Sequence, residues 1–304
     1  MKGTQILKWL ALITCLFMFL ATFGGGVVTR TDSGLGCGQE WPTCNGKLVP
    51  AHTVASVIEY SHRFVSAMAG LLSLSSFAGF MLVFRKRRTD LRVFSGLTLA
   101  FVIIQGIMGA FAVVFSQSTA VMALHFGFAL IAFASATMMT LGVWQEASDS
   151  AKSKRTQGAP VKKGFRWLVW GSTIYTYLAV YTGAFLTHAT TKNINDFLGI
   201  APLSIHQISG GLLFVVILIV GHFAYHKHPD HRDLRMLGVA SALLLLLQVI
   251  VGMILLVVAG RPEIYMFVVL SHMVIIAAAF AILCYMSFRV WQLSPERMKK
   301  AALE

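Results

Sequence analysis

The sequence predicts an all-α polytopic membrane protein, with eight transmembrane helices in two pseudo-symmetric four-helix bundles and both termini in the cytoplasm. Three observations lead to this prediction. Only 12% of the 304 residues are charged while 57% are hydrophobic, uncharged runs are long enough to cross a bilayer, and the two halves of the chain resemble each other. Soluble domains have about 25% charged residues, so the composition argues against a soluble enzyme or a nucleic-acid-binding protein.

Runs without Asp, Glu, Lys or Arg mark the spans, because a helix needs about 20 apolar residues to cross the hydrocarbon core. The first run is interpreted as a retained helix, since 21–24 is a poor signal-peptidase site. The third run contains 53 residues and divides at the polar stretch 116–119 into two spans. The seven runs that supply eight spans lie between Lys8 and Arg30, Arg63 and Arg85, Arg92 and Glu146, Arg166 and Lys192, Asp196 and Lys227, Arg235 and Arg261, and Glu263 and Arg289.

The distribution of basic residues predicts the orientation. With these spans, 20 of the 25 Lys and Arg residues fall on the side that holds both termini, and basic residues are enriched in cytoplasmic loops. The net charge of +13 is therefore a topology signal, and no nucleic-acid partner is expected.

The chain is predicted to contain two copies of a four-helix unit. The matching segments and residues are Gln105–Val114 with Gln248–Val257, Gly25–Thr29 with Gly183–Thr187, His62 with His206, and His125 with His272. The predicted domains are an N-terminal half (1–145), a cytoplasmic linker (146–165), a C-terminal half (166–290) and a cytoplasmic tail (291–304).

Four of the ten histidines, His62, His125, His206 and His272, lie in the outer part of even-numbered spans. One such histidine would be read as a polar residue bonded to a neighbouring helix, but four at repeated positions indicate a cofactor site in each bundle. Two imidazoles leave a zinc or copper site short of ligands, whereas a haem needs only axial ligands from the protein. The pattern therefore predicts one bis-histidine haem site per half.

The two halves differ beside the first histidine of each pair. Glu59 and Arg63 flank His62 at helical spacing, while Leu203 and Gln207 flank His206. An ionisable residue at membrane depth suggests function, so Glu59 is predicted to be catalytic, as a carboxylate beside the haem. A salt bridge with Arg63 is the structural alternative.

Cys37 and Cys44 lie in the first outward loop, where disulfides can persist. A structural disulfide is the favoured interpretation, and a redox-active pair is the alternative.

These motifs resemble haem A synthase, in the bacterial form with a cysteine pair in the first extracytoplasmic loop. The resemblance is carried by Ile58–Phe64, Thr31–Cys44 and Met122–Gly127 and extends over nearly the whole chain. The family oxidises the C8 methyl group of haem O to a formyl group, giving haem A. One departure is that some members have a second cysteine pair in the loop between spans 5 and 6, and 192–202 contains none.

The resemblance implies roles for the site residues and partners. His62 and His125 would bind haem O as substrate, with Glu59 as the essential acid, and His206 and His272 would bind a haem b that supplies electrons. Haem O synthase and a haem-copper oxidase or its assembly factors would be partners in the cytoplasmic membrane, with a membrane quinol as a candidate electron donor. The sequence allows a homo-oligomer without predicting one.

Two other classes of protein fit part of the pattern. A di-haem electron carrier of cytochrome b type explains the four histidines but not Glu59. A quinone-linked thiol oxidase explains the cysteine pair but not the histidines, and its six-residue spacing differs from the Cys-x-x-Cys redox motif.

Overall fold

The computed structural model describes residues 2–48, 53–85, 87–115, 118–147, 158–188 and 201–303, and most of these residues are helical. They contain no β-strand, which confirms the all-helical fold. The first four helices are α1 (Lys2–Arg30), α2 (Val54–Val83), α3 (Thr89–Val114) and α4 (Thr119–Ala147). The later ones are α6 (Lys163–His188), α7 (Pro202–Lys227), α8 (Arg232–Val257), α9 (Pro262–Gln292) and the short α10 (Pro295–Leu303).

Seven helices in the described part of the chain, α1–α4 and α7–α9, are long and apolar enough to cross a membrane. The protein is therefore a multi-pass membrane protein. Helix α6 has 26 residues, as many as α3, but it is more polar because tyrosines and threonines interrupt its apolar residues.

Helix α2 begins earlier than the uncharged run on which its span was predicted. It starts at Val54, with Thr53 as its N-cap, so Glu59 and Arg63 lie inside the helix. The two side chains form an ion pair, and this pairing allows two charged residues within one membrane helix.

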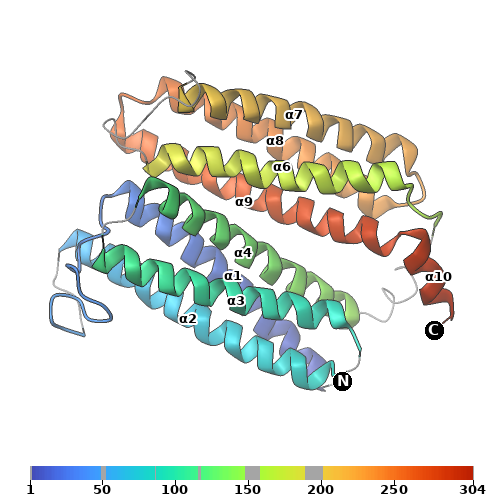
Figure 1. Cartoon of the computed structure of the whole chain (residues 1–304), viewed down its shortest axis with the longest axis horizontal. Coiled ribbons are helices and arrows are strands. Elements are labelled where there is room, and N and C mark those ends of the chain that lie inside the picture. Colours follow the sequence, from blue (N-terminus) through green and yellow to red (C-terminus); the bar gives the residue numbers. More distant parts are fainter. Residues whose placement is uncertain are drawn as a thin grey trace. The chain divides into compact units, whose positions relative to one another are not determined.

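The chain divides into two compact units near Ala147. The first unit holds α1–α4, which run side by side as a bundle (Figure 1). Each helix packs against its neighbours in sequence, and α1 also packs against α4, which closes the bundle. Met18, Ala69, Ala132 and Ala136 form part of its core.

The second unit holds α7–α9 and most of α6. Helices α7 and α8 pack together, as do α8 and α9, and Gly221 and Gly238 allow the backbones of α7 and α8 to approach closely. Helix α6 joins the same unit through hydrogen bonds. Trp170 donates to the Ser287 carbonyl of α9 (3.0 Å), and Tyr175 donates to the Ser209 carbonyl of α7 (3.0 Å).

Two predicted segments lie outside the described residues. They are most of the predicted linker, of which 148–157 is not described, and most of the loop 192–202 without cysteines, of which 192–200 is not described.

Candidate functional site

The four candidate histidines all lie toward the N-terminal ends of their helices, two in each unit. His62 and His125 lie on α2 and α4 of the first unit, and His206 and His272 lie on α7 and α9 of the second. Each side chain is partly buried. The structure therefore places one histidine pair in each unit, at corresponding positions.

Each histidine ring lies against a glycine of the helix that precedes its own. His62 lies beside Gly24 and Gly25 of α1, and His125 beside Gly109 of α3. In the second unit His206 lies beside Gly183 of α6, and His272 beside Gly252 of α8. A Cβ atom added at Gly183 would lie only 2.7 Å from Cε1 of His206, so the absence of a side chain makes room for the imidazole.

The histidine pair of the second unit has a separation suited to one metal ion between the two rings. The ring centroids of His206 and His272 are 6.4 Å apart, with an interplanar angle of 73°. Metal–imidazole bonds are about 2 Å long, so two rings at this separation could both reach a group that would be held between them. In the first unit, His62 and His125 lie within electrostatic range of each other.

Three of the four imidazoles have a ring nitrogen that the described residues do not satisfy. Nδ1 of His62, of His125 and of His272 is buried without a hydrogen-bond partner in the described part of the chain, an arrangement that is costly unless a ligand, water or a small movement satisfies it. Within the same residues, no cluster of three His, Cys, Asp or Glu side chains could hold a bare metal ion. Two imidazoles per unit therefore suit a haem, which brings four nitrogen ligands of its own.

His206 is the exception among the four rings. Its Nδ1 lies 3.0 Å from the hydroxyl oxygen of Thr182 on α6. That hydroxyl also donates to the carbonyl of Ala179 at 2.7 Å. Nδ1 of His206 thus has a side-chain partner, whereas Nδ1 of His62, of His125 and of His272 has no hydrogen-bond partner within the described residues.

Glu59 is buried, with 3% of its surface exposed, and both carboxylate oxygens accept hydrogen bonds. Oε1 accepts from Nε of Arg63 at 3.0 Å, and Oε2 accepts from the backbone N–H of Cys37 at 2.8 Å. The salt bridge considered from the sequence is therefore present. The contact with Cys37 is additional, and it joins Glu59 to the cysteine loop.

Arg63 also bonds directly to the cysteine loop. Its Nη1 donates to the carbonyls of Glu40 (2.9 Å) and Thr43 (3.0 Å). Cys37 and Cys44 are joined by a disulfide bond, and both residues are fully buried. The loop, the disulfide and the Glu59–Arg63 pair therefore form one hydrogen-bonded assembly at the start of α2.

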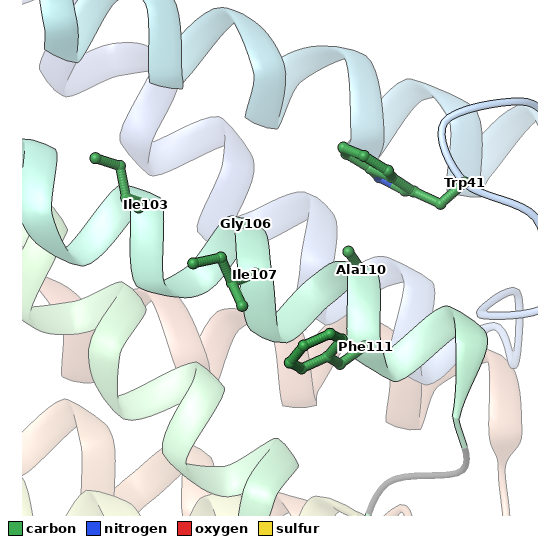
Figure 2. A pocket seen from close by; sticks show the side chains of 6 residues that line it. All are labelled: Trp41, Ile103, Gly106, Ile107, Ala110 and Phe111. Atoms are coloured by element: carbon green, nitrogen blue, oxygen red, sulfur yellow. The ribbon is translucent and has the colours of Figure 1, made fainter.

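A shallow apolar pocket of about 470 Å³ lies on the outer face of α3, beneath the ring of Trp41 in the cysteine loop (Figure 2). Its lining consists of Trp41, Ile103, Gly106, Ile107, Ala110 and Phe111. These residues offer almost no polar surface, and none of them is a candidate site residue. The pocket therefore suits an apolar chain rather than a reacting group.

Sequence reasoning missed Thr182 and the glycines as neighbours of the histidines, although the signal was present. Gly25, Gly109, Gly183 and Gly252 all belong to the repeated segments. The repeat also contains Gln105 and Gln248, each of which has a buried side-chain atom without a partner in the described part of the chain.

Comparison with known proteins shows similarity over most of the chain. The family model described as cytochrome oxidase assembly protein (COX15-CtaA) matches residues 8–57 and 52–198. Heme A synthase of Bacillus licheniformis is 34% identical over 296 residues, which cover 92% of this chain and 95% of that protein. Heme A synthase of Exiguobacterium sibiricum is 35% identical over 286 residues, which cover 90% and 92%.

A third relative, Heme A synthase of Bacillus mycoides, is 34% identical over 297 residues, which cover 93% of this chain and 92% of that protein. All three relatives are bacterial, and seven helices of this chain can cross a membrane, so the protein is a multi-pass protein of the bacterial cytoplasmic membrane. The matches span both histidine pairs and the cysteine loop. The chain belongs to the haem A synthase family of cytochrome oxidase assembly proteins.

Proposed function

We propose that this protein is a haem A synthase. It converts the C8 methyl group of haem O to a formyl group by successive hydroxylations that consume dioxygen as the oxidant together with electrons from a donor, and so supplies haem A to haem-copper oxidases. The observation that carries the proposal is an asymmetry between the two units. Both hold a histidine pair, but among the described residues a buried carboxylate, Glu59, accompanies only the pair of the first unit. Leu203 stands at the equivalent position of the second. The names of the relatives agree with this activity.

In the first unit, His62 and His125 bind haem O as substrate, and Glu59 is the catalytic residue. Two charge-assisted hydrogen bonds from Arg63 and one hydrogen bond from the Cys37 N–H fix the carboxylate, three residues before His62. A carboxylate at a fixed place beside the substrate can accept a proton or stabilise positive charge that develops during oxidation. Burial excludes water and strengthens that interaction.

In the second unit, His206 and His272 bind haem b. When bound, this haem supplies reversible one-electron transfer. The protein positions the two imidazoles, and it places no acidic side chain where Glu59 stands in the first unit. The two functions correspond to the predicted domains: oxidation of haem O belongs to the N-terminal half (1–145), and electron transfer belongs to the C-terminal half (166–290).

The proposed membrane topology has eight spans, which are the seven helices α1–α4 and α7–α9 together with α6. A helix of 26 residues is about 39 Å long, which exceeds the thickness of the hydrocarbon core. Its polar side chains have partners inside the second unit: Thr173 lies 2.8 Å from the Ser287 hydroxyl, and Trp170 and Tyr175 bond to carbonyls of α9 and α7. Polar groups paired in this way can be accommodated within the membrane.

With eight spans, the excess of Lys and Arg on one side supports a cytoplasmic position for both termini. The histidine pairs and the cysteine loop then lie toward the outer surface. The partners that follow are a haem O synthase as the source of substrate, a haem-copper oxidase or its assembly factors as the acceptor of product, and a membrane quinol as the electron donor.

A di-haem electron carrier is the second candidate. The Glu59–Arg63 ion pair favours it, because the pair gives Glu59 a structural reason to be present. The thiol oxidase has less support, since thiol–disulfide exchange requires access to a sulfur atom and both cysteines are fully buried. The haem types in the purified protein separate the two haem proteins: a synthase carries haem O or haem A beside haem B, whereas an electron carrier holds haem B alone.

The disulfide gives a separate prediction. Cys37→Ser is expected to lower the free energy of unfolding by about 2 kcal/mol and to reduce activity, because the Cys37 N–H that bonds Glu59 is no longer fixed. Haem ligation should stay intact, since neither sulfur atom is an iron ligand in this proposal. Thermal unfolding and the haem spectrum of the variant check both parts, with Cys284→Ser as the control. A loss of the bis-histidine spectrum in Cys37→Ser alone would contradict the prediction.

A further inference from the structure

The two units differ at one residue that touches the first histidine of each pair. In the second unit this residue is Thr182, whose hydroxyl oxygen lies 3.0 Å from Nδ1 of His206. The single hydroxyl proton of Thr182 is donated to the Ala179 carbonyl at 2.7 Å. When the hydroxyl donates to Ala179, its oxygen is left as an acceptor, and the tautomer of His206 that has its proton on Nδ1 donates to it.

The contact with Thr182 favours this tautomer of His206. A neutral imidazole that carries its proton on Nδ1 has its lone pair on Nε2, which is the form that binds a metal ion. Metal-bound histidines almost always donate the other ring N–H to a protein acceptor, and loss of that acceptor costs 10- to 100-fold in metal affinity or activity. The Ala179–Thr182–His206 chain thus prepares His206 as a firmly held ligand.

The first unit lacks this chain of bonds. The repeat that matches Gly183 with Gly25 matches Thr182 with Gly24. The geometry agrees, because a Cβ atom added at Gly24 would lie 3.2 Å from Nδ1 of His62. With no side chain at Gly24, that nitrogen is buried and has no partner among the described residues.

We propose that this difference sets how long each unit retains its haem. Thr182 makes His206 a strong ligand, so the second unit keeps its haem as a resident cofactor. Gly24 leaves His62 unsupported, so the first unit binds haem weakly enough to exchange substrate and product. This inference rests on the proposed function, because only a synthase must release the haem of one unit and retain that of the other.

Haem transfer to apomyoglobin, followed in the purified full-length protein loaded with haem B, tests the proposal. The wild type should lose haem in a fast phase, which is absent from His62→Ala, and in a slow phase, which is absent from His206→Ala.

Thr182→Val keeps the shape of the side chain but removes the acceptor. It should accelerate the slow phase by about 10-fold or more and raise the reduction potential of that haem, while Thr182→Ser should restore both values. A slow phase and a potential unchanged in Thr182→Val would overturn the proposal.

The reciprocal change is made in the first unit. Gly24→Ser introduces a hydroxyl group beside His62 and should slow the fast phase, whereas Gly24→Ala introduces the same Cβ without an acceptor and should not. Equal effects of the two substitutions would mean that packing, not hydrogen bonding, controls exchange, and would overturn the inference for His62. Failure of the proposed function is distinct from both results: the wild type would then show equal, slow loss from both units and make no haem A.

Discussion

A Glu59→Gln variant is expected to bind haem in both units but to form no haem A. Glutamine has nearly the shape of glutamate, and its amide oxygen can still accept the hydrogen bond that Oε2 receives from the Cys37 N–H. The substitution removes the negative charge and the ability to accept a proton. General acid–base groups contribute 10²- to 10⁴-fold to rates, so turnover should fall by at least about 100-fold. Haem extracted from membranes that express the variant measures the effect.

Controls separate catalysis from folding in this variant. Glu59→Gln leaves Arg63 without its carboxylate, so the haem content per chain must match the wild type before a loss of turnover is attributed to chemistry. Glu263→Gln makes the same change in an exposed carboxylate at the start of α9 and should leave turnover unchanged. Normal turnover in Glu59→Gln would remove Glu59 from the mechanism.

The second large effect is expected from His206→Ala or His272→Ala. Each variant should lose the bis-histidine spectrum of the second unit, because its iron would retain only one protein ligand. Haem A formation should stop as well, since the first unit no longer receives electrons. Absorption and electron paramagnetic resonance spectra of the purified variants provide the measurement.

His226→Ala is the matched control for these variants. His226 lies at the other end of α7, and its side chain is exposed. This variant should keep the wild-type haem content and spectrum. Retention of the full bis-histidine spectrum in both His206→Ala and His272→Ala would contradict the proposed pairing.

Much of the fold follows from patterns that the sequence contains directly. Scarcity of charge predicts membrane helices, and the all-helical structure agrees. Uncharged runs locate helix ends less well, because charges that pair inside a helix interrupt a run without ending the helix. Glu59 and Arg63 in α2 show this effect. In α6, hydropathy alone is a weak guide, since residues such as Thr173 bond to neighbouring helices instead of facing lipid.

The candidate site was predictable only in part. The repeat identified the four histidines, and their helical positions followed from it. The bond between the Cys37 N–H and Glu59 depends on how a loop folds back onto α2, and no local pattern specifies that path. Thr182 and Gly24 each lie one residue before the repeated segment. The sequence gives no sign that either residue lies beside a histidine ring, so the effect of their difference could not be predicted without the structure.

The most direct test of the account is extraction of pigments from membranes that contain this protein together with a haem O synthase. The account predicts haem A in the extract from the wild type and its absence when Glu59 is replaced by glutamine. An extract with only haem B and haem O, from a protein that shows a complete bis-histidine spectrum and has a quinol donor available, would contradict it and identify an electron carrier instead.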